Sequence, residues 1–156
     1  MRIGIGYDIH SIGEGNFLTI GGVKIAYNGG FIAHSDGDVL IHAIIDAILG
    51  ALNLPDIGER FPDSSPEYKN IDSTILLEDV VKQMVSMNYK IENIDCIVIA
   101  EKPKLSNYKD KIKSHLSKIL RTQNVSIKAK TNEKIGDIGE SKAIASLCTV
   151  LLNEIQ

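Results

Sequence analysis

The stretch VLIHAIID, residues 39–46, lies inside a longer segment, residues 36–52, whose side chains are apolar almost all round a helix. A helix with apolar residues on every side is typical of a protein interior. We therefore expect this helix to be buried and to end before Pro55. Its imidazole, His42, is conspicuous, because burying a polar ring is costly unless something binds it.

Strands and helices alternate on both sides of this buried helix. The other expected elements are a strand at 2–8, a hairpin at 17–27, an amphipathic helix at 72–88, a buried strand at 94–100, a helix at 105–121, a strand at 124–130 and a last helix at about 140–154. Strands separated by helices favour a two-layer α/β sandwich, in which helices cover a β-sheet. The 156 residues are enough for one domain, residues 1–156, and too few for two comfortable ones.

Composition excludes several classes of function. A net charge of −3 leaves no general basic surface for duplex nucleic acid, and 5% aromatic residues without Trp leave no base-stacking platform. We therefore expect no nucleic-acid partner. The chain shows no long apolar signal core and no stretch of transmembrane length, so we expect no membrane association. Cys96 and Cys148 lie in apolar runs and are expected to be buried thiols, which fits a reduced, cytoplasmic setting.

Asp8 and His10 close the run IGIGY, residues 3–7, which is typical of a strand. Side chains two residues apart on a strand share one face and lie about 7 Å apart along the backbone. Together with His42, they supply two imidazoles and one carboxylate. This is the ligand set of a catalytic zinc site, which keeps a fourth position open.

Two other interpretations of Asp8, His10 and His42 compete with a zinc site. The same ligand set forms the facial triad of iron oxygenases, although those sites usually sit on all-β barrels and this chain alternates. Alternatively, His42 is a core histidine satisfied by Asp38 or Asp46, each one turn away. If a metal is bound, Asp46 becomes the candidate acceptor for the far N–H of His42.

The block HSDGD, residues 34–38, precedes the buried helix. Ser35 or Asp36 is expected to cap that helix. A helix start also presents free N–H groups and a positive dipole end, which suit a phosphate. His34 and Ser35 lie just outside this start and are candidates to add donors to the same phosphate.

Three loops each admit a functional and a plain interpretation. Residues 56–65 either grip the hydroxyls of a polyol or simply form turns. Lys102 and Lys104 follow a buried strand, where ligands of α/β folds bind, and they face phosphates or a base if they are not simply solvated. Glu133 is either surface charge or, beside phosphates, a magnesium ligand. His115 is expected to be solvated on a helix face.

Taken in order, these motifs resemble the 2-C-methyl-D-erythritol 2,4-cyclodiphosphate synthase family of the non-mevalonate isoprenoid pathway, over nearly the whole chain. The segments that carry the resemblance are RIG at 2–4 with GYDIH at 6–10, IGGVKI at 20–25, AHSDGDV at 33–39 with His42 and Asp46, DIG at 56–58, FPD at 61–63, Ala100 with Pro103 and Lys104, and Lys128, Ala129, Thr131, Glu133, Lys134 and Gly136. The HSDGD block, at this spacing from Asp8 and His10, is highly specific.

The resemblance implies a homotrimer with active sites between neighbouring subunits. It also implies zinc on Asp8, His10 and His42, and magnesium or manganese on Glu133. His34 and Thr131 match positions credited with transition-state stabilisation. The positions that match substrate contacts of the family are Asp8, His10, His34, Ser35, Asp56, Ile57, Gly58, Phe61, Pro62, Asp63, Ser64, Ser65, Ala100, Glu101, Lys102, Pro103, Lys104, Leu105, Ser106, Lys130, Thr131, Asn132 and Glu133.

The family reaction converts 4-diphosphocytidyl-2-C-methyl-D-erythritol 2-phosphate to 2-C-methyl-D-erythritol 2,4-cyclodiphosphate and CMP. The 2-phosphate attacks the β-phosphorus of the diphosphate, and CMP leaves. Because this nucleophile is already an anion, the site needs in-line positioning and charge neutralisation rather than a strong base. The chain agrees, since it shows metal ligands and phosphate donors but no nucleophile–base pair.

The chain departs from the family pattern near its C-terminus. Where the family has an aromatic residue and then an arginine, this chain has Asp137 and Glu140. We hypothesise that Glu140 and Lys142 exchange signs with the family's Arg and Glu and keep an ion pair. Two rival functions stay open from the residues alone. One is a metal-dependent phosphohydrolase with the same three ligands, and the other is a non-catalytic metal- or nucleotide-binding module.

Overall fold

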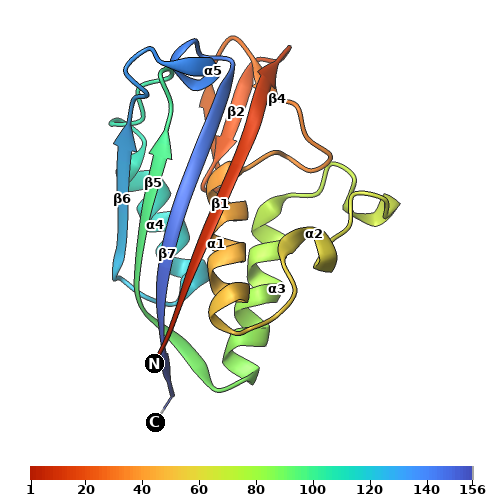
Figure 1. The fold of residues 1–156 in the computed structure, drawn as a ribbon, viewed down its shortest axis with the longest axis vertical. Coiled ribbons are helices and arrows are strands. Elements are labelled where there is room, and N and C mark those ends of the chain that lie inside the picture. The colour runs from red at the N-terminus through yellow and green to blue at the C-terminus, as the bar shows by residue number, and fades with distance from the viewer. Residues whose placement is uncertain (156) are drawn as a thin grey trace.

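A mixed five-stranded sheet forms one layer of the molecule, and helices packed on one of its faces form the other (Figure 1). The computed structural model describes residues 1–155. The sheet has the order β4–β1–β7–β5–β6, in which β5 and β6 pair in parallel and the other neighbours are antiparallel. Its strands are β4 (Gly30–Phe31), β1 (Arg2–Gly13), β7 (Ala143–Glu154), β5 (Tyr89–Ile99) and β6 (Val125–Lys130). The predicted α/β class is confirmed.

The main helices are α1 (Val39–Ala51), α3 (Ser73–Ser86) and α4 (Lys109–Leu120). The hairpin predicted at 17–27 forms a separate two-stranded sheet, β2 (Phe17–Ile20) with β3 (Val23–Ala26). The loop predicted after α1 contains a short helix, α2 (Ile57–Arg60), and a 3₁₀ turn, Pro66–Tyr68. A second short helix, α5 (Gly136–Gly139), follows β6.

β1 and α1 pack backbone against backbone. A Cβ atom built on Gly6 would lie 1.9 Å from the carbonyl oxygen of Ala43, and one on Gly4 would lie 1.9 Å from that of Ala47. No side chain fits in that space, so the strand needs glycine at these two positions facing the helix. This close approach lays the first turn of α1 against the second half of β1, where Asp8 stands.

The N-cap of α1 is Asp38, and the expectation of Ser35 or Asp36 is wrong. Oδ1 of Asp38 accepts hydrogen bonds from the backbone N–H groups of Leu40 and Ile41, at 3.2 and 3.0 Å. Asp36 lies two residues too early and instead accepts from the backbone N–H of Asp38. The buried helix therefore starts three residues later than the apolar pattern predicts.

The same carboxylate ties the β2–β3 hairpin to α1. Its oxygens accept hydrogen bonds from the N–H groups of Gly21 and Gly22, at 2.9 and 2.7 Å. Burial raises the pKa of Asp38 to about 6, opposed by the backbone hydrogen bonds and assisted by the charge of Asp36. One buried acid thus fixes both the start of the interior helix and the turn beside it.

The last element is a strand, and the helix predicted at about 140–154 is wrong. β7 lies between β1 and β5 and pairs antiparallel with both. Ile144 and Cys148 are four residues apart, so they fit a helical spacing and also share one face of a strand. Val150 and Leu152 continue the alternation and are buried on that same face. Pairing with two neighbours along the sheet overrides the helical pattern.

The face of the sheet opposite the helices is apolar and uncovered. Ile3, Ile5, Tyr7 and Ile9 of β1 point to this side and are 76, 65, 55 and 44% exposed. An exposed apolar patch of contiguous side chains is typical of an interaction surface. We call these four side chains the open β1 face.

Both cysteines are buried free thiols, as predicted. Cys96 of β5 stands opposite Cys148 of β7 on the helix-covered side of the sheet, with 3.4 Å between the sulfur atoms. Burial in such apolar surroundings makes thiols inert. None of the helices within residues 1–155 combines the length and the apolar character needed to cross a membrane.

Candidate metal centre and its cavities

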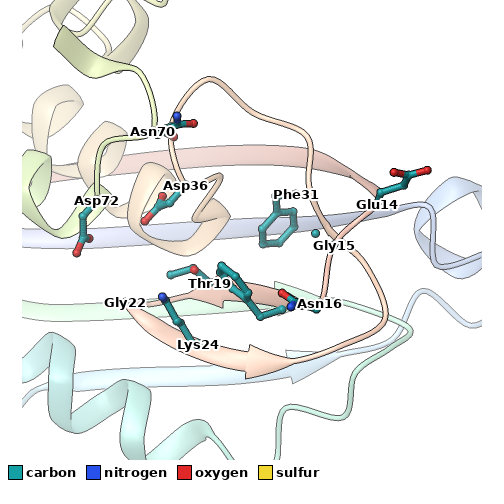
Figure 2. Close-up of a pocket in the computed structure, with 13 residues that line it drawn as sticks. Glu14, Gly15, Asn16, Thr19, Gly22, Lys24, Phe31, Asp36, Asn70 and Asp72 are labelled. Carbon is teal, nitrogen blue, oxygen red and sulfur yellow. The ribbon is translucent and has the colours of Figure 1, made fainter.

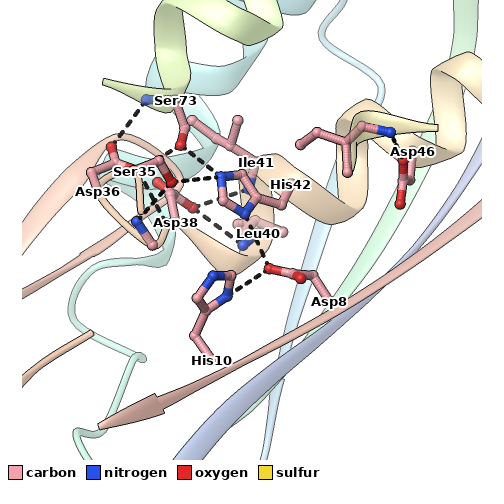
Figure 3. A network of polar contacts seen from close by, with 12 residues as sticks. Asp8, His10, Ser35, Asp36, Asp38, Leu40, Ile41, His42, Asp46 and Ser73 are labelled. Carbon is pink, nitrogen blue, oxygen red and sulfur yellow. Dashed lines mark hydrogen bonds and ion pairs between the residues drawn. The ribbon is translucent and has the colours of Figure 1, made fainter. Parts of the chain in front are cut away.

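Three candidate ligands converge where β1 passes the first turn of α1 (Figure 3). Nδ1 of His10 lies 2.8 Å from Oδ2 of Asp8, and Nδ1 of His42 lies 3.2 Å from the same oxygen. One ligand atom from each residue lies within 4.8 Å of the other two. The structure thus brings together the three residues that the sequence predicts to share one ion.

Secondary structure fixes all three side chains. β1 continues to Gly13, five residues past the predicted end, so Asp8 and His10 lie inside a paired strand rather than at its frayed end. The backbone N–H of His42 makes the first intrahelical hydrogen bond of α1, to the carbonyl oxygen of Asp38 at 3.0 Å. The centre is therefore held by backbone pairing and helix capping, not by a loop.

The polar atoms at this centre fit a bound cation. Oδ2 of Asp8 and Nδ1 of His10 are enclosed, and within residues 1–155 their only polar contacts are those among the three candidate ligands themselves. Buried polar atoms without partners are rare in native proteins and call for an explanation. Two imidazole nitrogens and one carboxylate oxygen that converge on one point are the donor set that Zn²⁺ prefers in catalytic sites. A bound divalent ion would give both of these enclosed atoms a ligand bond.

Charge at the centre favours the ionised carboxylate. Burial raises the pKa of Asp8, but hydrogen bonds and charge from His10 and His42 outweigh it and lower the pKa to about 2. Burial lowers the pKa of His42, but the hydrogen bond and charge of Asp8, together with the charges of Asp38 and Asp36, raise it above its ordinary value. The site thus attracts positive charge, which a proton or a metal ion supplies.

The far nitrogen of His42 faces hydroxyl groups, and the prediction that Asp46 accepts its N–H is wrong. Nε2 lies 2.9 Å from Oγ of Ser73 and 3.3 Å from Oγ of Ser35 (Figure 3). Asp46 lies one turn further along α1 and accepts from the backbone N–H of Ile57, at 2.8 Å. Sequence reasoning missed Ser73, whose only signal is its place after Asp72 at the start of a predicted helix.

A cavity of about 320 Å³ opens on the three ligands, and we call it the metal cavity. Nε2 of His34 is enclosed without a hydrogen-bond partner in the described chain, on the wall of this cavity. Apolar side chains that the sequence did not single out complete it. The lining residues are Asp8, His10, Ile32, Ala33, His34, Ser35, His42, Ile57, Gly58, Phe61, Asp63, Tyr68, Ile71 and Leu76.

A second predicted group of residues lines a different cavity, of about 260 Å³, beyond the carboxyl ends of β5 and β6. We call it the β5-end cavity. Most of its wall comes from the segment after β5, and Lys130 and Thr131 close it from β6. Its lining residues are Ala100, Glu101, Pro103, Lys104, Leu105, Ser106, Ala129, Lys130 and Thr131. The predicted site residues that line either of these two cavities therefore form two separate groups within one chain.

Some predicted site residues line neither cavity. Asp56 caps α2 by accepting from the backbone N–H of Glu59, at 2.9 Å, and Glu133 accepts from the hydroxyl of Thr131, at 2.8 Å. Both positions lie next to a cavity rather than in its wall. The residues outside both linings are Asp56, Pro62, Ser64, Ser65, Lys102, Asn132 and Glu133.

Comparison with known proteins agrees with this geometry. The YgbB family model matches residues 1–153. A 2-C-methyl-D-erythritol 2,4-cyclodiphosphate synthase from Brachyspira hyodysenteriae is 53% identical over 99% of both chains. This chain belongs to the YgbB family. The predicted resemblance is thereby confirmed.

Solved structures agree with the family assignment. IspF from Plasmodium falciparum, in a CDP complex, superposes with a TM-score of 0.87 at 43% identity, over 99% of this chain and 97% of that one. Bifunctional IspDF from Campylobacter jejuni superposes with a TM-score of 0.95 at 39% identity, over 99% of this chain. This chain spans 42% of that longer protein. The YgbB fold is therefore shared by a free-standing chain and by part of a larger one.

The departures from the YgbB pattern lie on and after α5, at the exposed end of the sheet. The ammonium group of Lys142 contacts the carboxylate of Glu140, and it lies 3.8 Å from that of Asp137. The hydrogen bond and charge of Lys142 lower the pKa of Glu140, and Glu140 in turn raises the pKa of Lys142. The hypothesised ion pair between Glu140 and Lys142 is present.

A further cavity of this YgbB chain, of about 530 Å³, was not predicted as a site. It lies between the β2–β3 hairpin and the loop before α1, with Phe31 over its middle and Asp36 and Asp72 on its wall (Figure 2). Ser35 belongs to the walls of both this cavity and the metal cavity. His115 lies on α4 as expected but is only partly solvated, because its side chain is half-buried and its Nε2 is enclosed.

Proposed function

We propose that this chain catalyses the metal-dependent intramolecular phosphoryl transfer that converts 4-diphosphocytidyl-2-C-methyl-D-erythritol 2-phosphate to 2-C-methyl-D-erythritol 2,4-cyclodiphosphate and CMP. It is then a phosphorus–oxygen lyase of non-mevalonate isoprenoid biosynthesis, with residues 1–156 as one domain. The observation that carries the proposal is the convergence of Asp8, His10 and His42 on one cavity, in a chain 53% identical to a relative of that name.

Asp8, His10 and His42 hold the first ion, for which their donor set favours Zn²⁺. When bound, such an ion polarises phosphoryl oxygens and offsets the repulsion between the phosphate groups. The enclosed Nε2 of His34, on the wall of the same cavity, is placed to donate to a phosphate oxygen. The remaining work is positioning, since an anionic nucleophile needs no base.

The β5-end cavity takes the cytidine end of the substrate. Lys104 and Lys130 are exposed around it and offer positive charge to a diphosphate. Thr131 donates to Glu133, which holds its carboxylate at the rim. We propose that Glu133 binds the second divalent ion, Mg²⁺ or Mn²⁺, because Mg²⁺ is usually held by one or two carboxylates together with substrate phosphates.

The active protein is a homotrimer, with each active site between two subunits. Two features support this part of the proposal. The metal cavity and the β5-end cavity are separate in one chain, although one substrate must reach both. The open β1 face also exposes contiguous apolar side chains, which a neighbouring subunit would bury.

The test is product analysis. The purified chain is incubated with the CDP-linked substrate, Zn²⁺ and Mg²⁺, and the products are followed by ³¹P NMR and by chromatography of the released nucleotide. A cyclic diphosphate with an equal amount of CMP is expected. His42→Ala should reduce turnover by about 10³-fold or more, since a metal centre supplies several kcal/mol of transition-state stabilisation.

Other products would identify the rival functions. Inorganic phosphate in place of the cyclic product would indicate a phosphohydrolase that uses the same three ligands. Nucleotide binding without turnover, unchanged in His42→Ala, would indicate a binding module. Either result contradicts the proposed reaction.

A further inference from the structure

We propose that Ser73, held by Asp36, is a positioning residue that sets which ring nitrogen of His42 carries the proton. It keeps the proton on Nε2, so that the lone pair of Nδ1 faces Asp8 and a bound cation. This inference rests on the metal site of the proposed function. It assigns a role to a residue outside the cavity walls and outside every motif of the sequence.

The contacts form a chain from a carboxylate to the imidazole (Figure 3). Oγ of Ser73 lies 2.9 Å from Nε2 of His42 and donates its proton to Oδ1 of Asp36. The backbone N–H of Ser73 donates to the other oxygen of Asp36, at 3.1 Å. Ser73 has no exposed surface, so water does not compete for its hydroxyl.

The single hydroxyl proton of Ser73 determines the tautomer of His42. A serine hydroxyl carries one proton, and Ser73 gives it to Asp36, because a carboxylate is the stronger acceptor. Only the lone pairs of Ser73 Oγ are left for His42. The Nε2 atom must therefore donate, and in a neutral imidazole this leaves the lone pair on Nδ1.

The Nδ1 lone pair then faces a carboxylate oxygen. Nδ1 of His42 lies 3.2 Å from Oδ2 of Asp8, and two lone pairs at that distance repel each other. A cation bound by both atoms turns this repulsion into two ligand bonds. The hydrogen bond from Asp36 through Ser73 thus holds His42 in the one neutral form that binds a metal through Nδ1.

Ser35 does not replace Ser73 in this role. Its Oγ lies further from Nε2 of His42, at 3.3 Å, and already accepts from the backbone N–H of Gly37, at 3.2 Å. It also lines two cavities, so its hydroxyl is free to turn toward a ligand. Nothing in the described chain fixes the direction of the Ser35 proton, whereas Asp36 fixes that of Ser73.

The test compares Ser73→Ala with Ser117→Ala. Ser117 is matched, because it is a buried helical serine whose hydroxyl has no partner in residues 1–155. Zn²⁺ affinity is measured by competition with a chromogenic chelator. The tautomer of His42 is read from imidazole ¹⁵N shifts of the metal-free protein at pH 9. Ser73→Ala should weaken Zn²⁺ binding about 10- to 100-fold, the usual effect of losing such a partner, and raise the Nδ1–H population.

Two further variants guard against loss of folding. Ser73→Thr keeps the hydroxyl and should restore most of the Zn²⁺ affinity. Asp36→Asn offers Ser73 an amide N–H, which frees the serine proton to point at His42, so the Nδ1–H tautomer should increase and Zn²⁺ should bind more weakly. If Ser73→Ala does not fold, the tautomer in Asp36→Asn decides the question.

The outcomes separate this inference from the function on which it rests. If the unaltered chain binds no Zn²⁺, both are overturned. If it binds Zn²⁺, and Ser73→Ala matches Ser117→Ala in affinity and tautomer, only the role of Ser73 is overturned. An unchanged tautomer in Asp36→Asn overturns it equally.

Discussion

The metal cavity and the β5-end cavity differ in how their polar groups are held. At the metal cavity, His42 is buried on a helix and both ring nitrogens face partners from the chain. At the β5-end cavity, Lys104, Lys130 and Thr131 are exposed, and they stand on or beside loops. The first region has its geometry built in before any ligand arrives. The second supplies charge and shape that a substrate and a neighbouring subunit would complete.

Gly6→Ala is expected to give the largest effect, because it disturbs the packing of β1 on α1 that positions the candidate metal ligands. The new methyl group would meet the Ala43 carbonyl at 1.9 Å, so β1 and α1 must move apart. We expect a loss of at least about 3 kcal/mol of unfolding free energy in urea, the upper end of overpacking costs. Zn²⁺ binding should fall with it.

Gly136→Ala is the matched control for that prediction. Gly136 begins α5 with a φ of 65°, and a Cβ there meets no atom within 4 Å. Gly136→Ala should lose only about 1–2 kcal/mol of unfolding free energy, because alanine is strained in the left-handed backbone conformation. Its Zn²⁺ affinity should be unchanged. Equal losses in the two variants would contradict the claim that the two regions differ in how tightly they are built.

Stabilisation by Zn²⁺ should grow as the pH rises from 6 to 8. The pKa of His42 is raised in the metal-free protein, so the pairing of its charged ring with Asp8 stabilises that form below about pH 6.5. This stability is lost as the pH rises through the raised pKa. Zn²⁺ needs the neutral ring, so its apparent affinity should rise up to about tenfold per pH unit while one proton is displaced.

Calorimetry with and without Zn²⁺ at several pH values measures this trend through the midpoint temperature. The matched measurement uses a cytidine nucleotide in place of Zn²⁺. The nucleotide is proposed to bind at the β5-end cavity, whose wall contains none of the three candidate ligands. A Zn²⁺-induced shift that is constant or falls with rising pH would show that His42 does not exchange its proton for the metal.

Lys104→Ala should act on the other region alone. An exposed lysine beside a diphosphate contributes about 1 kcal/mol, because solvent screens its charge. We expect KM for the CDP-linked substrate to rise about fivefold, a factor that corresponds to this energy, with kcat and Zn²⁺ affinity unchanged. Lys113→Ala, an exposed lysine on α4, is the control. A fall in Zn²⁺ affinity would mean that the two cavities are not independent in one chain.

The smallest effect is expected at α5. Exchanging the charges of Glu140 and Lys142 keeps their ion pair with opposite signs, so assembly measured by light scattering should be unchanged. Glu140→Lys alone removes the pair and places two ammonium groups together. A large loss of assembly in the double exchange would show that a neighbouring subunit interacts with the particular charge at each of the two positions.

The convergence of the three candidate metal ligands was predictable because its signals are local. Asp8 and His10 follow the period of a strand, and His42 is a polar ring inside an apolar helix. The cap and the supporting hydroxyl were not predictable in the same way. Asp36 and Asp38 are two residues apart and both suit a helix start, and only the position of the β2–β3 turn chooses Asp38. Ser73 lies 31 residues from the ring that it contacts.

The fold was predictable except where one apolar pattern satisfied two periods. In β7, Ile144 and Cys148 agree with both a helix and a strand, and strand pairing on both sides decides between them. Pairing partners from residues 2–11 and 89–99 are not visible in the segment itself. The division of the site residues between two cavities was also not visible in any one segment, because it depends on which strand ends lie together in the fold.

The central place of β7 also bears on how a nascent chain folds. Every other strand of the sheet precedes it in the sequence, yet β1 and β5 have no contact along the sheet except through it. While residues 143–154 are still inside the ribosome, α1 lacks one of the two strands, β1 and β7, on which it packs, and the candidate metal ligands on β1 lie on an unpaired edge. Synthesis proceeds from the N-terminus at about 5–20 residues per second. The growing chain therefore spends several seconds with an open edge where its last strand belongs, and a chaperone that shields such edges would act in that interval.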